Sequence, residues 1–417
     1  MTTSGFDPRS QLSRTALIVW TAAVLVYVMA ITGRTSMGVA GVAAVDHFHI
    51  NAAQLAVFTS VQVGTYALVQ IPMGILIDRF GARRLLFAGA LIMAIGQIIL
   101  GLTTSYSVAI FARVLVGAGD ASAFLSVMRI LPFWFPLKHT PLFTQLTAAV
   151  GQAGQFLSAV PFLALLGASG WRLAFLSLGG IGVLVALAAN ILIHDSPTEV
   201  RTKRTGSLLD VLRLPVCWMG FFNHFTMLMP LIVFNLLWGM PTMTLGMGLD
   251  ESQAASVLVI NTIVTILAGP LHGIISARAG RKRELFSLGY TVLLLASMIA
   301  FFMSTTPRGF LAIATLAGLL GLLGPAANYG FDTVRESLPH AVVTTGTGLA
   351  NMGGFSAAMI SAQGIGLLLA HYSDGVWTWA DFRIAWWAVF VVWIIGIIGL
   401  VLTRALALRS PGPAVES

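Results

Sequence analysis

Long apolar runs separated by short polar segments fill most of the chain and predict membrane-spanning helices. Each run holds about the ~20 apolar residues that a helix needs to cross the hydrocarbon core of a bilayer. The short alternating strands of a transmembrane barrel would give a different pattern. We therefore expect an all-α membrane protein. Its twelve predicted spans lie at 15–38, 54–76, 85–104, 108–131, 142–166, 171–193, 215–240, 253–275, 285–304, 309–332, 343–371 and 382–404.

The composition favours a membrane protein, because 57% of the 417 residues are hydrophobic and 9% are charged. A soluble protein of this composition would expose more apolar surface than a stable monomer tolerates, whereas lipid solvates such side chains. The first run follows Arg9 and Arg14, as the core of a signal peptide follows basic residues. It is longer than the usual ~7–15 residues of that core. We interpret it as a retained first span.

Composition and motifs argue against an enzyme or a metalloprotein. The single cysteine, Cys217, excludes an internal disulfide and a multi-cysteine metal site. His224, His272 and His371 occur singly, which favours packing roles over metal ligation. The sequence offers no phosphate-binding loop, paired catalytic carboxylates or nucleophile triad in a supporting context. We expect no catalytic residue, metal or cofactor.

The formal net charge of +8 is distributed unevenly along the chain. Lys and Arg gather at both termini and in alternate loops, whereas the other loops hold only Arg172, Arg308 and Arg383. Positively charged loops stay on the cytoplasmic side of a membrane. We therefore expect a plasma-membrane protein with both termini in the cytoplasm. The same placement of charge argues against a nucleic-acid partner.

Two halves of similar length flank a polar stretch at 194–214, which predicts an N-terminal bundle at 1–193 and a C-terminal bundle at 215–417 joined by a cytoplasmic linker. The segment GILIDRFGARR at 74–84 recurs in degenerate form as GIISARAGRKR at 273–283. The same offset aligns GQAGQF at 151–156 with ANMGGF at 350–355. Parallel repeats of this kind are typical of transporters. The matched positions of the first pair, each 199 residues apart, are Gly74 and Gly273, Arg79 and Arg278, Gly81 and Gly280, and Arg84 and Arg283.

Two motifs give the chain a resemblance to the major facilitator superfamily over nearly its whole length. The fourth span carries Arg-x-x-x-Gly-x-Gly as Arg113, Gly117 and Gly119. The resemblance implies two pseudo-symmetric six-helix bundles, alternating access, and a latch at 74–84 that holds the outward-open state. Ala277 replaces the acidic residue of the second copy, so a latch there is expected to be weaker or absent. The first copy, between spans two and three, is formed by Gly74, Asp78, Arg79, Gly81, Arg83 and Arg84.

Each residue type in this motif has a physical use. Gly74 allows two helices to approach closely, and Gly81 suits a turn with positive φ. Asp78, at a helix end, can accept hydrogen bonds from the N-terminus of a neighbouring helix, whose dipole favours an anion. Arg83 and Arg84 either pair across the bundle, bind anionic lipid headgroups, or only fix the topology.

Ionisable residues at bilayer depth are costly and usually functional. In the fourth span, Arg113, Gly117 and Asp120 share one helical face. Burial favours the neutral form of Asp120 and a nearby arginine favours its carboxylate, so we expect Asp120 and Arg113 to serve proton coupling. The alternative is a static Arg113–Asp120 pair or network that orders the bundle. We expect Arg129, near the cytoplasm, to snorkel. The candidates are Arg34, Arg113, Asp120, Arg129 and Asp332.

In the first span, Tyr27 and Arg34 share a face, and the fork of an arginine matches a carboxylate. The surrounding YVMAITGRTSMGVAGVA is similar to the first span of the anion:cation symporter branch, in which an arginine contacts an organic anion. Asp120 and the WFP at 134–136 also match that branch, but Gly33 stands where it carries an acidic residue. We expect Arg34 and Tyr27 to bind substrate. Alternatively, Arg34 is a structural residue at the outer interface.

The segment GTGLANMGGF at 346–355 resembles part of the Gly-rich signature of the nitrate/nitrite porter branch. Asn351 is placed there to hydrogen-bond a ligand, although small residues also serve close helix packing alone.

We therefore expect a monomeric, proton-coupled uptake carrier for a small organic anion. A co-transported proton offsets the electrical cost of importing an anion against an inside-negative potential. Proton-driven export of a drug or metabolite, and a non-transporting receptor, are the alternatives.

Overall fold

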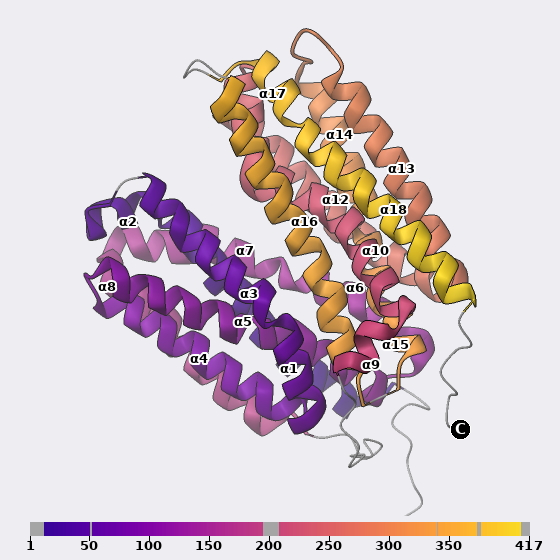
Figure 1. Cartoon of the computed structure of the whole chain (residues 1–417). Coiled ribbons are helices and arrows are strands. Elements are labelled where there is room, and N and C mark those ends of the chain that lie inside the picture. The colour runs from indigo at the N-terminus through magenta and orange to yellow at the C-terminus, as the bar shows by residue number, and fades with distance from the viewer. Residues whose placement is uncertain (1–11, 51, 195–207, 340, 373–376, 410–417) are drawn as a thin grey trace, which may run out of the picture. The chain divides into compact units, whose positions relative to one another are not determined.

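The computed structural model describes residues 12–50, 52–194, 208–339, 341–372 and 377–409 (Figure 1). Within these ranges the regular secondary structure is entirely helical. Contacts divide the chain into two compact units. Unit 1 comprises Met1–Leu208 with Pro339–Gly348, and unit 2 comprises Leu209–Leu338 with Leu349–Ser417. Most of the linker predicted at 194–214 lies outside the described residues.

Up to residue 194 the α-helices are α1 (Arg14–Val39), α2 (Gly41–Phe48), α3 (Ala52–Phe80), α4 (Ala82–Leu102), α5 (Tyr106–Trp134), α6 (Thr140–Gly151), α7 (Ala153–Leu157) and α8 (Leu163–Leu192). From residue 208 they are α9 (Leu208–Arg213), α10 (Pro215–Ile232), α11 (Gly239–Pro241), α12 (Glu251–Ala279), α13 (Arg283–Phe302), α14 (Phe310–Leu323), α15 (Tyr329–Ser337), α16 (Val343–Tyr372), α17 (Trp379–Ala385) and α18 (Trp387–Arg409). Single 3₁₀ or π turns connect several of them, at Leu137–His139, Ser158–Phe162, Val233–Trp238, Thr242–Gly246, Gly280–Lys282 and Gly324–Asn328.

Ten helical stretches in the described residues are long and apolar enough to cross a membrane, so the protein is a multi-pass membrane protein. Two of these stretches, Leu137–Leu192 and Ser252–Phe302, have 56 and 51 residues, far more than the ~20 that one crossing needs.

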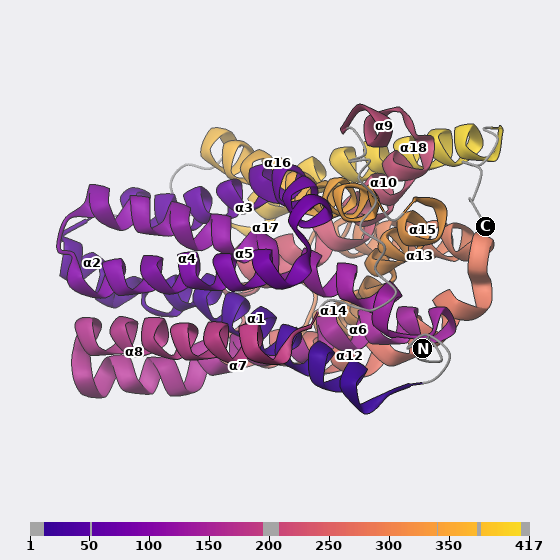
Figure 2. The same ribbon diagram turned by 90° about the horizontal axis from the view of Figure 1, so that it is seen from below.

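Both long stretches fold back on themselves. The rings of Phe162 and Phe175 lie 5.2 Å apart, although thirteen residues of straight helix would separate them by ~20 Å. The rings of His272 and Tyr290 likewise lie 5.6 Å apart. The first stretch reverses at Gly170, where φ is 76° and ψ is 177°, giving two helical runs side by side in Figure 2. The second stretch bends at the turn beginning with Gly280.

Glycine also sets the turns of the repeated motif and a close helix crossing. Gly81, between α3 and α4, has φ of 86°, and Gly280 has φ of 50°, which confirms the positive φ predicted at Gly81. Gly89 of α4 faces Gly119 of α5 so closely that a Cβ on Gly119 would lie 2.4 Å from the carbonyl oxygen of Gly89. Membrane helices pack through such small residues.

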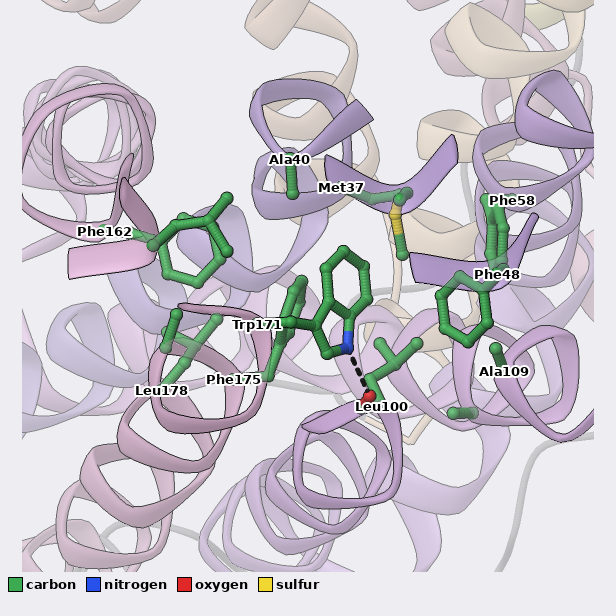
Figure 3. Close-up of a cluster of buried hydrophobic side chains, with 14 of the residues drawn as sticks. Met37, Ala40, Phe48, Phe58, Leu100, Ala109, Phe162, Trp171, Phe175 and Leu178 are labelled. Atoms are coloured by element: carbon green, nitrogen blue, oxygen red, sulfur yellow. Dashed lines mark hydrogen bonds between the residues drawn. The ribbon is translucent and has the colours of Figure 1, made fainter. Parts of the chain in front are cut away.

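A buried aromatic cluster holds one end of unit 1 together (Figure 3). Trp171 follows the reversal in α8 and donates a hydrogen bond from Nε1 to the carbonyl of Leu100 at 2.7 Å. His47 of the short helix α2 stacks on the same indole, with ring centroids 4.7 Å apart. The cluster therefore joins α2, α4 and α8.

Replacing Gly170 by alanine should lower the stability of the purified protein. The backbone region with φ near 76° and ψ near 177° is essentially open to glycine alone, so we expect a loss of about 1–3 kcal/mol. A Cβ at Gly170 meets no atom within 4 Å, so the whole cost lies in the backbone. Thermal unfolding in detergent measures it.

The matched control is Gly167→Ala in the same helix, where a Cβ also meets no atom within 4 Å and φ is ordinary. Alanine there should leave the melting temperature unchanged or raise it, because alanine favours helix. Equal melting of the two variants would show that the reversal does not depend on glycine.

Candidate functional site

An ion pair between α1 and α5 forms the centre of the polar residues in unit 1. Arg34 donates from Nε to one carboxylate oxygen of Asp120 at 2.7 Å and from Nη2 to the other at 2.9 Å. The side chain of Asp120 is fully buried, whereas that of Arg34 is 18% exposed. Paired N–H groups match a carboxylate in geometry as well as in charge. The arginine is thus the partner that solvent or a ligand reaches more readily.

Two further residues hold Arg34 in place. Its guanidinium lies over the ring of Tyr66 from α3, 4.5 Å from the ring centroid, which is the geometry of a cation–π contact. Its backbone carbonyl accepts a hydrogen bond from Arg113 at 3.2 Å. Neither Tyr66 nor the contact with the backbone was predicted from the sequence.

Arg113 itself is completely buried, and its bonds are to neutral groups. It donates to the carbonyls of Gly33 and Arg34 and to the side-chain oxygen of Gln62. Among the described residues it forms no ion pair, so Asp120 pairs with Arg34 and not directly with Arg113. Both a static network of these residues and a role in proton coupling fit this geometry. Arg34, Arg113 and Asp120 together leave one positive charge in excess at this site.

Tyr27 lies two helical turns before Arg34 in α1. Its ring packs against Phe124, with centroids 5.4 Å apart, and a Cβ on Gly151 would lie 2.4 Å from a ring carbon. The absence of a side chain at Gly151 therefore makes room for the tyrosine. Binding of substrate by Tyr27 and Arg34 remains a prediction.

Asp78 lies at the first turn of α16. It accepts hydrogen bonds from the backbone N–H of Thr344 at 3.2 Å and of Thr345 at 2.8 Å, and from the Thr345 hydroxyl at 2.7 Å. Gly74 lies one turn earlier on α3, and a Cβ there would come within 2.7 Å of the Thr345 backbone. The glycine lets α3 approach α16, and the carboxylate meets the free N–H groups and the positive end of the helix dipole.

Arg129 also contacts Asp78, with Nη1 3.2 Å from the carboxylate, and it lies over the ring of Phe133. Its side chain is 7% exposed. The prediction that it snorkels was wrong, because its partner lies on α3, where the pattern within α5 gives no sign of it.

The arginines of the motif differ in their surroundings. Arg83 donates from Nε and Nη2 to the carbonyl of Asn190, at the C-terminus of α8, where a cation is favourable. Arg79 is exposed and lies beside the ring of Phe80, and Arg84 is exposed. Only Asp78 and Gly74 therefore reach α16.

The second copy of the motif is built differently. Ala277 and Arg278 are exposed, and Gly273 is buried. The neighbouring Ser276 donates to Asp332, which also binds Arg335 at 2.6 Å. Arg283 pairs with Glu336 at 2.8 Å. Thus α15 supplies the carboxylates that the repeat itself has lost.

The Gly-rich segment of α16 packs against α10. A Cβ on Gly353 would lie 2.3 Å from the carbonyl of Phe221, and one on Gly354 would meet His224 at 2.8 Å. Asn351 is buried one turn from this contact, and Nδ1 of His224 lies 3.1 Å from the carbonyl of Ala327. A ligand contact by Asn351 is still a prediction.

Known proteins similar to this chain are membrane transporters. The family model of the Major Facilitator Superfamily matches residues 23–247, more than half of the chain. The chain is 23% identical over 370 residues to the probable sulfoacetate transporter SauU of Cupriavidus necator, covering 83% of this chain and 85% of the relative.

Two other relatives have names that point to different roles. The chain is 23% identical over 351 residues to the probable galactarate/D-glucarate transporter GudP of Escherichia coli, covering 73% and 76% of the two chains. It is 24% identical over 298 residues to multidrug resistance protein 2 of Bacillus subtilis, covering 68% and 70%. The relatives are transporters and not enzymes. The chain therefore belongs to the Major Facilitator Superfamily and is a membrane transporter.

Proposed function

We propose that the protein imports a small organic anion together with a proton, by alternating access. The observation that carries this proposal is the two-point pair of Arg34 with the fully buried Asp120. A carboxylate in that position binds the arginine when charged and releases it when protonated. The released guanidinium then binds the carboxylate or sulfonate of the substrate.

The charges at the site support an anion as the substrate. Arg34 and Arg113 are opposed by one carboxylate, Asp120, so an anion brings the group closer to neutrality. Protonation of Asp120 adds to the positive charge and strengthens the attraction. Arg113 is held by Gln62 and backbone carbonyls, and in this mechanism it positions α1 and attracts the anion without leaving its place.

For the architecture we propose twelve crossings in two six-helix bundles, at 1–193 and 215–417. Two of the ten apolar stretches, Leu137–Leu192 and Ser252–Phe302, are helical hairpins, and each is long enough to cross the membrane twice. The other eight cross once, which supports a count of twelve. The distribution of Lys and Arg supports a plasma-membrane protein with both termini in the cytoplasm. A monomer is sufficient for this mechanism.

For the motif at 74–84 we propose a latch. Asp78 accepts three hydrogen bonds from the first turn of α16, and these bonds break when the protein changes between its outward-open and inward-open states. Gly74 keeps the two helices close enough for the bonds to form.

The names of the relatives suggest the substrates to try first, sulfoacetate and D-glucarate. In proteoliposomes with an inward proton gradient, we expect one of these anions, or a related one, to accumulate above its outside concentration. A protonophore should abolish the accumulation. Drug movement driven in the opposite direction to the proton would support export instead, as multidrug resistance protein 2 suggests. Binding without flux would support a receptor.

The variant Asp120→Asn should keep exchange of substrate across the membrane but lose accumulation driven by the proton gradient. Asparagine resembles a carboxyl that is permanently protonated, so Arg34 can bind the anion but the proton is not carried. Counterflow and gradient-driven uptake in the same vesicles measure the two activities.

The matched control is Asp250→Asn at the exposed N-cap of α12, where asparagine caps as well as aspartate. It should retain both activities.

Arg34→Lys keeps the positive charge but not the forked geometry of the guanidinium, so it should weaken anion binding about tenfold or more and reduce both activities. Loss of exchange in a well-folded Asp120→Asn protein would contradict the role given to Asp120.

The latch predicts that Asp78→Asn lowers turnover about tenfold, since charge-assisted hydrogen bonds are each worth ~1.5–3 kcal/mol. Thr345→Val removes only the hydroxyl bond and should have a smaller effect of the same kind. Thr347→Val is the control, because that hydroxyl bonds within its own helix, to Val343. Unchanged turnover in Asp78→Asn at normal expression would remove the latch.

A further inference from the structure

Two arginines from distant parts of the sequence cap one helix end, the C-terminus of α13. Arg308 donates to the carbonyls of Ala300 at 3.0 Å and Phe301 at 3.3 Å. Arg383, in the last turn of α17, donates to the carbonyls of Phe302 at 2.9 Å and Met303 at 3.2 Å. The last four carbonyls of a helix lack partners within it, and here both guanidiniums supply them.

The two arginines bring more positive charge than the helix end balances. A helix C-terminus carries about half a negative charge, against two positive ones here. Among the described residues neither arginine forms an ion pair with a carboxylate. The concentration is unusual for its position, because the loops on this side of the predicted topology hold only three cations.

A groove of about 640 Å³ begins at Arg308 and continues between α13 and α14. Its walls are largely apolar and include Phe301, Leu311, Leu316 and Leu319. From Leu311 to Leu319 the helix rises ~12 Å, close to the ~15 Å depth of one leaflet of the hydrocarbon core. Figure 1 shows α13 and α14 side by side in unit 2.

The groove lies at the depth of a lipid tail, and the arginine at the depth of a headgroup. The spans end at Phe302 and begin again at Phe310, so Arg308 lies in the short turn between them. Leu311 at the rim is 78% exposed. A water-soluble anion would satisfy the arginines and leave these apolar walls uncovered. An apolar molecule would fill the groove and leave the charge unbalanced.

We propose that this site binds an anionic phospholipid, with its phosphate at Arg308 and one acyl chain in the groove between α13 and α14. Arg308 holds the phosphate at the end of α13, and the acyl chain covers the walls of the groove. The site lies entirely within unit 2 and is independent of the ion pair of Arg34 and Asp120.

Native mass spectrometry of the full-length protein in detergent, titrated with dioleoylphosphatidylglycerol, tests the proposal. Arg308→Gln should weaken binding of the tightest lipid about tenfold, which is the usual effect of losing a charge-assisted hydrogen bond. Ala312→Trp places an indole in the groove and should weaken binding to a similar extent. Dioleoylglycerol, which has the same chains but no phosphate, should bind the unaltered protein at least tenfold more weakly, and glycerol phosphate should not compete.

Arg172→Gln is the matched control, since it removes the same charge from an exposed arginine on the same side of the predicted topology. It should bind the lipid like the unaltered protein. Equal binding by Arg308→Gln and Arg172→Gln, or equal affinity for dioleoylglycerol and phosphatidylglycerol, would overturn the proposal. Should Ala312→Trp fail to fold, the comparison of the two arginine variants still decides the matter.

Discussion

A charged side chain at bilayer depth has to find its partners inside the protein, and this requirement explains the contacts of the buried charged residues in unit 1. The cost of an isolated charge in hydrocarbon is several kcal/mol even after snorkelling and local thinning of the bilayer. Arg34 meets Asp120, Arg113 meets carbonyls and an amide, and Asp78 meets a helix N-terminus. In each case the partner comes from another helix. The charged side chains therefore connect neighbouring helices, and they are also the candidates for a role in transport.

The same requirement applies to the backbone, and it accounts for the positions of the glycines. Helices satisfy their own N–H and C=O groups, so reversals and close crossings are where special residues are needed. Gly170 and Gly81 adopt positive φ at turns, and Gly89 and Gly119 let two backbones touch. The last carbonyls of α13 have no N–H partner within the helix, and two arginines donate hydrogen bonds to them instead.

Features that depend on one helix were predictable from the sequence, whereas most of those that depend on two were not. The contact of Asp78 with a helix N-terminus is an exception, because a sequence motif indicated it. The run at 253–275 lies within α12, which extends from Glu251 to Ala279 because polar residues at the ends continue the helix. The spacing within α5 placed Arg113 and Asp120 on one face, but Asp120 pairs with Arg34 of α1. Tyr66 and the burial of Arg129 were missed for the same reason. The short helix α2 and the π turns at Val233–Trp238 and Thr242–Gly246 were not predicted from the sequence.

Gly33, immediately before Arg34, has no side chain that could carry a second proton, and this affects the energetics of the transport we propose. Asp78 and Asp120 are the only acidic residues in the spanning helices of the first half, and Asp78 is engaged by α16. If Asp120 carries the one coupled proton, a monovalent anion crosses with no net charge. Membrane voltage then contributes nothing to its accumulation, and each pH unit of gradient concentrates it at most about tenfold. A divalent anion such as sulfoacetate or D-glucarate would still carry one negative charge inward with the proton, so an inside-negative voltage would oppose its accumulation.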